Sequence, residues 1–146
     1  MIENKIPPHI TIGAFHAARE EEAKLLQLVE NFAQGQKAGT VQFSGVGDFN
    51  GKVLFLKPEK NLFLSKINKE LHTLLLPEFE KAENGYYLPD IWFPHTTLAT
   101  RLNQNQFSAA EKIANQISLP LEAAIEELAV YQCSPFLELK KFGLNR

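Results

Sequence analysis

Two histidines share a short pattern whose chemistry suits a phosphate group. His9 and His95 each follow a proline and precede a threonine, Thr11 or Thr97, by two positions, in the β-like runs PHIT and PHTT. Residues two apart on a strand point to the same side and lie about 7 Å apart, so one phosphate could touch both side chains. The hydroxyl would donate a hydrogen bond to a phosphoryl oxygen, and the imidazole would carry a proton.

A matched pair of such histidines suits general acid–base catalysis without a metal. One neutral imidazole would take a proton from water or a ribose hydroxyl, and the other, protonated, would give one to the departing oxygen. The residues do not decide which histidine is the base. His16 and His72 lack the threonine partner and are interpreted as structural or exposed. Because no pair among the 4 histidines has the close spacing of usual zinc motifs, we expect no metal and no other cofactor.

Alternation along a strand predicts which neighbours share a face with each threonine. Beyond Thr11 these are a glycine and a phenylalanine, and beyond Thr97 an alanine and an arginine. The small residues would let a ligand approach the backbone, and the arginine could hold a second phosphate or simply be solvated. A tryptophan just before the second motif could stack on a nucleobase or pack in a loop. The candidate substrate contacts are therefore Gly13, Phe15, Ala99, Arg101 and Trp92.

The elements that must position the first motif form a predicted β-α-β-β repeat. A strand starting at Pro8 is followed by a helix, whose apolar residues recur at helical spacing, and by two β-like runs joined at Asn50-Gly51. Asn-Gly is the strongest short hairpin signal in a sequence. The expected elements are a strand at 8–15, a helix at 17–34 that ends at Gly35, and strands at 40–48 and 52–57.

A second repeat follows an additional helix and a connection. Leucine and isoleucine residues at helical spacing predict the additional helix up to Pro77, and the residues after it have no lasting period. Ser108 and Glu111 are interpreted as a capping box of the helix in the second repeat. The expected elements are a helix at 60–76, a loop at 77–93, a strand at 94–102, a helix at 106–117 and an antiparallel pair at 121–133 and 136–144.

The repeated element order predicts an α+β fold, bilobal and pseudo-symmetric, with antiparallel sheets flanking a central cleft. The whole chain, 1–146, would be a single two-lobed domain, with one lobe at about 1–76, a connecting loop at 77–93 and a second lobe at about 94–146. Two lobes related by an approximate two-fold axis would bring His9 and His95 face to face, because the histidines occupy equivalent strands.

The composition of the chain limits the kinds of binding partner that we expect. Fifteen lysines and arginines against 17 aspartates and glutamates give a net charge of −2, so no global field would hold a long polyanion, and a nucleic-acid partner would be short or held locally. No apolar run approaches the roughly 20 residues of a membrane span, and the N-terminus lacks a signal-peptide core, so we expect a cytoplasmic protein. Cys133, the only cysteine, is expected to be a buried small hydrophobe. The sequence does not determine the oligomeric state.

The two motifs resemble the paired signatures, His-x-Ser/Thr-hydrophobic, of the two-histidine (2H) phosphoesterase superfamily, which includes bacterial 2'-5' RNA ligases and cyclic nucleotide phosphodiesterases. The residues that carry the resemblance are His9-Ile10-Thr11-Ile12 and His95-Thr96-Thr97-Leu98. The resemblance implies a bilobal α+β fold with both motifs lining a central cleft. It also implies metal-independent chemistry on 2',3'-cyclic phosphate or 2'-5' phosphodiester linkages of nucleotides or short RNA.

Two other functions stay open at this stage. The same cleft could bind an RNA end or a nucleotide without turning it over, since a binding module would retain both phosphate-gripping motifs. A metal-dependent hydrolase would instead show metal in the purified protein and lose activity with a chelator.

Overall fold

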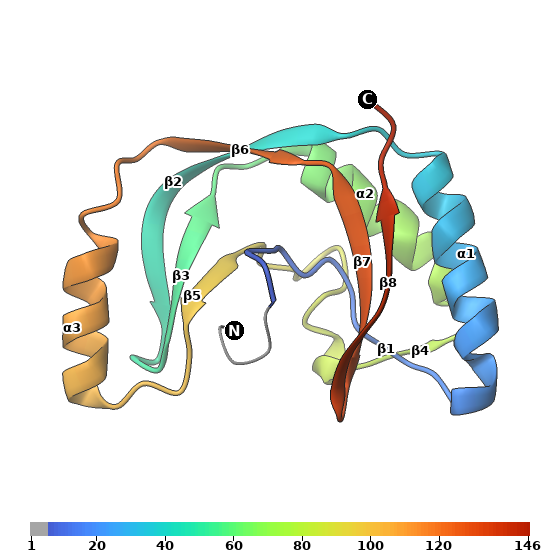
Figure 1. Cartoon of the computed structure of the whole chain (residues 1–146), viewed down its shortest axis with the longest axis horizontal. Helices are drawn as coiled ribbons and strands as arrows, with labels where there is room; N and C mark the ends of the chain where they lie inside the picture. Colours follow the sequence, from blue (N-terminus) through green and yellow to red (C-terminus); the bar gives the residue numbers. More distant parts are fainter. Residues whose placement is uncertain (1–5) are drawn as a thin grey trace. The chain divides into compact units, whose positions relative to one another are not determined.

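The computed structural model describes residues 6–146 and shows helices and antiparallel sheets, which confirms the predicted α+β fold class (Figure 1). The chain divides into two compact units, each assembled from three separate segments. Unit 1 contains the described residues up to Thr11, together with Val41–Asn61 and Phe93–Ala123. Unit 2 contains Ile12–Thr40, Leu62–Trp92 and Ala124–Arg146. Each unit therefore draws on both of the predicted repeats.

A four-stranded sheet with the order β5-β3-β2-β6 dominates unit 1. Its strands are β2 (Gly39–Phe49), β3 (Val53–Pro58), β5 (Thr96–Ala99) and β6 (Leu121–Ile125). The tight turn between β2 and β3 has positive φ angles of 52° at Asn50 and 66° at Gly51, as the predicted Asn-Gly hairpin requires. The Gly51 N–H also donates to the Asp48 carboxylate at 2.8 Å. The predicted hairpin is confirmed.

The helix α3 (Gln104–Ala114) packs against β3 in unit 1. Its N-terminus differs from the prediction, because the capping box is formed by Asn103 and Gln106 rather than by Ser108 and Glu111. The Asn103 side chain accepts a hydrogen bond from the Gln106 N–H at 2.8 Å, and the Gln106 side chain accepts one from the Asn103 N–H at 3.0 Å. Asparagine is among the best N-cap residues, and the extended backbone of Asn103 lets it start the helix before Ser108 is reached.

Unit 2 is built around two helices, α1 (Glu22–Gln34), preceded by the short 3-10 helix η1 (Arg19–Glu21), and α2 (Leu62–Leu75). Both helices match the predicted ones. The other large element is a hairpin of β7 (Glu127–Cys133) and β8 (Phe136–Gly143), which packs against α1. The buried apolar core of unit 2 comprises Val29, Ala33, Leu71, Leu75, Phe79, Phe142 and Leu144.

The long β-run predicted near the C-terminus is divided between two sheets. Its first half, β6, joins the sheet that contains β2, and its second half, β7, pairs with β8. The two halves separate at Glu126. Cys133, expected to be buried, is exposed. It pairs with Phe136 in the last pair before the turn of a hairpin to which no third strand within residues 6–146 is added.

The predicted strand at 8–15 is much shorter in the structure. Only Phe15–His16 (β1) forms a strand, and it pairs with β4 (Glu80–Lys81), inside the segment predicted as a loop. Before β1, two carbonyl groups have other partners: Ile12 O accepts from the Asn68 side chain at 2.8 Å, and Ala14 O accepts from the Ala82 N–H at 2.9 Å. The alternation of apolar residues in segment 8–15 therefore indicates partial burial of the segment, but most of its residues do not pair with a neighbouring strand. No helix within residues 6–146 is long and apolar enough to span a membrane.

Candidate active site

Strand pairing sorts the side chains around the second motif onto two faces of the unit 1 sheet. Thr97 pairs with Phe55, and the neighbouring Thr96 pairs with Leu56. Cross-strand partners share a face, so Thr97 and Phe55 lie on one face, whereas Thr96 and Leu56, both buried, lie on the other. We call the first of these the motif face. By the register of β2 with β3 it also carries Gly45, Gly47, Phe49, Val53 and Lys57.

His95 immediately precedes β5 and is surrounded by aromatic rings. Its ring centroid is 5.1 Å from that of Phe49, 5.4 Å from that of Phe55 and 6.4 Å from that of Phe93. Its Nδ1 lies 2.9 Å from the backbone oxygen of Phe93. A carbonyl oxygen only accepts, so Nδ1 carries the proton in this contact. In a neutral imidazole, Nε2 is then the atom with the free lone pair.

His9 makes the same local contact as His95. Its Nδ1 lies 3.0 Å from the carbonyl oxygen of Pro7, again two residues before the histidine. In both motifs the residue between is a proline, Pro8 or Pro94, which restricts the residue before it to extended conformations. The proline before each motif therefore has a physical role: both imidazoles are oriented through Nδ1, which leaves Nε2 for chemistry.

The alternation predicted beyond Thr97 breaks within β5. Thr97 pairs with Phe55, but Ala99 pairs with Leu54, so β5 has one more residue than β3 over this step. This one-residue shift places Ala99 on the face of Leu54, opposite the motif face. Arg101 lies beyond the end of β5, is exposed, and has a positive φ of 55°. Strand alternation therefore does not place either residue beside Thr97, and their substrate contacts stay predictions.

The four predicted catalytic residues belong to one compact unit, and three of the predicted substrate contacts belong to the other. His9, Thr11, His95 and Thr97 all belong to unit 1, whereas Gly13, Phe15 and Trp92 belong to unit 2. A Cβ on Gly13 would lie 2.9 Å from the Phe15 ring and 3.2 Å from Leu71, so the small size of Gly13 accommodates packing within unit 2. Phe15 itself packs against the unit 2 core, and its ring lies 5.2 Å from that of His72. Trp92 is partly buried.

Sequence reasoning missed most of the side chains that surround His95. The sequence pattern places Phe49 and Phe55 in or beside the hairpin strands and indicates no role for Lys57, whose Nζ lies 5.8 Å from the Phe93 ring centroid. A usable signal existed. Pairing the strands outward from Asn50-Gly51 matches Phe49 with Val53 and Gly47 with Phe55, which puts both phenylalanines on one face.

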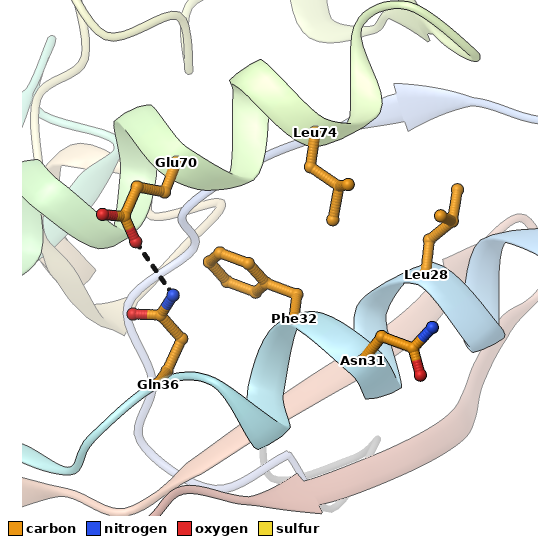
Figure 2. A pocket seen from close by; sticks show the side chains of 6 residues that line it. All are labelled: Leu28, Asn31, Phe32, Gln36, Glu70 and Leu74. Carbon is orange, nitrogen blue, oxygen red and sulfur yellow. Dashed lines mark hydrogen bonds between the residues drawn. The ribbon is translucent and has the colours of Figure 1, made fainter.

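A surface hollow of about 340 Å³ lies in unit 2 between α1 and α2 (Figure 2). Leu28 and Phe32 line it from α1 and Leu74 from α2, and at one end the Gln36 side chain donates to Glu70 at 2.9 Å. It contains no residue of either motif, and its main polar groups bind each other. Within the part of the chain that the structure describes, no group of three or more His, Cys, Asp or Glu side chains could hold a metal ion.

Comparisons with solved structures concern the fold of the chain. A crystal structure described as a phosphoesterase matches with a TM-score of 0.61 at 15% identity, covering 95% of this chain and 78% of that chain. A crystal structure of a Thermus thermophilus protein matches with a TM-score of 0.54 at 22% identity, covering 95% of this chain and 80% of the other. No curated protein matches the sequence. The fold is therefore shared with a protein described as a phosphoesterase.

A family model described as the 2'-5' RNA ligase superfamily matches residues 3–134, nearly the whole chain. The chain belongs to this superfamily, and the resemblance carried by its two His-x-Thr motifs is confirmed. Membership indicates an enzyme of the phosphoesterase or ligase type that acts on a nucleotide or RNA.

Proposed function

We propose that this protein is a metal-independent phosphoesterase that acts on 2',3'-cyclic phosphate or 2'-5' phosphodiester linkages of nucleotides or short RNA. His9 and His95 are its general acid and base, and Thr11 and Thr97 donate hydrogen bonds to the phosphoryl oxygens. Superfamily membership supports the substrate class. The observation that carries the catalytic assignment is the matched contact of both histidines, in which Nδ1 donates to the carbonyl two residues earlier.

That contact suits proton transfer because it favours one nitrogen of each imidazole as the reacting atom. A backbone carbonyl that accepts from Nδ1–H holds the imidazole in one tautomer, and in both histidines the reacting nitrogen is then Nε2. A neutral Nε2 accepts a proton, and a protonated Nε2 donates one. Two histidines with the same anchoring can therefore fill opposite roles in one reaction and exchange them in the reverse reaction.

In the proposed hydrolysis of a cyclic phosphate, Nε2 of one histidine removes a proton from water. The water oxygen forms a bond to phosphorus, and the bond from phosphorus to one ribose oxygen breaks. Nε2–H of the other histidine gives its proton to that departing oxygen, which leaves a phosphate monoester and a free ribose hydroxyl. The two histidines end with their protonation states exchanged and return to the starting states through solvent.

The test is turnover of a 2',3'-cyclic nucleotide and of a 2'-5' dinucleotide by wild type and by His9→Ala and His95→Ala, with products separated by chromatography. General acid–base groups contribute roughly 10²–10⁴-fold each, so each variant is expected to lose at least about 100-fold in kcat. His16→Ala, an exposed histidine outside both motifs, is the matched control and should keep wild-type turnover.

EDTA should leave the wild-type rate unchanged. Full activity in both motif variants would refute the two-histidine mechanism, and loss of activity with EDTA would identify a metal-dependent hydrolase. Measurable nucleotide affinity without turnover of any substrate would identify a binding module instead.

A further inference from the structure

We propose that Phe49 and Phe93, with Lys57 over the Phe93 ring, form a subsite beside His95 that holds the nucleobase of the substrate by stacking. This inference rests on the proposed function, because it takes the reacting phosphate to lie at His95. It assigns a role to Phe49 and Lys57 of the motif face and to Phe93, which precedes β5. The proposed acid–base chemistry does not use these side chains.

The first observation is that two large aromatic side chains next to His95 remain accessible. Phe49 is 40% exposed and Phe93 is 42% exposed, although each has its ring within 6.4 Å of the His95 ring. Their centroids are 6.0 Å apart at an interplanar angle of 72°. The hydrophobic effect disfavours such exposure, and accessible aromatic surface commonly marks a ligand site. Here that surface adjoins a histidine proposed to transfer protons.

The second observation is that the two exposed rings both pack against a buried ring, that of Phe55. Phe55, only 3% exposed, has its ring centroid 4.5 Å from that of Phe49 and 5.6 Å from that of Phe93. Phe55 and Phe49 are on paired strands of the sheet, so their positions are more rigid than those of loop residues. A stacking platform needs this preorganisation, because holding a base between mobile rings would cost conformational entropy.

The third observation is a positive charge over the ring of Phe93. The Lys57 Nζ lies 5.8 Å from the Phe93 ring centroid, and within residues 6–146 it forms no ion pair with a carboxylate. An ammonium group is a donor only, and every nucleobase has acceptor atoms on its edges. Lys57 can thus bond the edge of a base whose face lies on an aromatic ring.

These features favour a nucleobase over an apolar protein segment as the occupant. A planar base offers a π-face to Phe49 or Phe93 and acceptors to Lys57, and in a nucleotide it is attached to the same ribose as the reacting phosphate. Base–aromatic stacking tolerates different bases because each has a π-face. We therefore expect the subsite to favour nucleotides over base-free sugar phosphates, with little choice among bases.

The main experiment compares kcat/KM for 2',3'-cyclic AMP with that for 1-O-methylribose 2',3'-cyclic phosphate, which lacks the base. Stacking contributes the equivalent of roughly 5- to 150-fold per base, so wild type should favour the nucleotide by about that ratio. Phe49→Leu and Phe93→Leu keep an apolar side chain but remove the π-face, and each should lower the ratio by about 5-fold or more. Phe136→Leu is the matched control, because Phe136 is 38% exposed and its ring stacks on that of Tyr131, with a centroid distance of 5.1 Å.

A binding measurement separates this inference from the proposed function. Calorimetry with adenosine 5'-monophosphate and with ribose 5-phosphate gives two dissociation constants that need no turnover. If wild type hydrolyses no substrate but binds the nucleotide at least about 5-fold more tightly, with this preference lost in Phe49→Leu and Phe93→Leu, the catalytic proposal fails and the subsite stands. Equal affinity for the two ligands, or an unchanged preference in both variants, overturns the subsite.

Discussion

Replacing Gly47 with alanine would test how the sheet holds His95. Gly47 on β2 pairs with Phe55 on β3, and a Cβ at Gly47 would lie 2.7 Å from Cε2 and 2.8 Å from Cζ of the Phe55 ring. Carbon atoms prefer separations of about 3.5–4.0 Å, so the ring would have to move by roughly 1 Å. Phe55 is 3% exposed and is packed by Phe49, Phe93 and His95, so a movement of its ring would disturb these three contacts.

The expected cost follows from that overlap. Overpacking a buried site typically costs about 1–3 kcal/mol, which for a chain of this size lowers Tm by roughly 3–9 °C. Urea unfolding should show a lower midpoint with an unchanged m-value, since the surface exposed on unfolding hardly changes. If the Phe55 ring displaces His95 by about 1 Å, turnover of a cyclic nucleotide should fall by up to about 10²-fold.

Two further variants make this reasoning refutable. Gly45→Ala is the control for stability, because Gly45 lies on the same strand and face and a Cβ there would meet no atom within 4 Å. It should be neutral or slightly stabilising. In a double-mutant cycle, Phe55→Leu removes the ring atoms that collide with the new methyl group, so Gly47→Ala should cost less in that background. Equal costs in the two backgrounds, or a Gly47→Ala variant as stable as wild type, would show that the Gly47–Phe55 contact does not constrain the site.

Two other variants test the supports of the fold. Asn68 is 1% exposed and its side-chain amide donates to two backbone carbonyls, at 2.8 and 2.9 Å, so Asn68→Ala should lose at least about 2 kcal/mol in urea unfolding, whereas Asn31→Ala on the surface of α1 should lose almost nothing. Asn103→Ala removes the N-cap of α3 and should lose about 1 kcal/mol of unfolding free energy, measured in the same way. Ser108→Ala should have no such effect, and a larger loss there would restore the capping box first predicted from the sequence.

Local sequence signals predicted much of the secondary structure. Helical spacing located α1 and α2, and Asn50-Gly51 located the β2–β3 turn, because both signals depend on residues close together in the chain. The same signals were less reliable at element ends. The helix α3 begins earlier than expected because Asn103, rather than Ser108, caps its N-terminus. The strand β1 is short because strand pairing depends on a partner strand, which the alternation of residues along one segment does not reveal.

The two histidine motifs were found from sequence alone because their chemistry lies within four consecutive residues each, and the family match confirmed the superfamily that they indicate. The contact from Nδ1 to the carbonyl two residues earlier is equally local, and the preceding prolines were its signal. What only the tertiary structure decided was the surroundings of His95. Phe49 and Phe55 reach it from other strands, and the one-residue shift in β5 turns Ala99 away from it. Those features depend on strand register between segments about 40 residues apart in the chain, which short-range patterns do not encode.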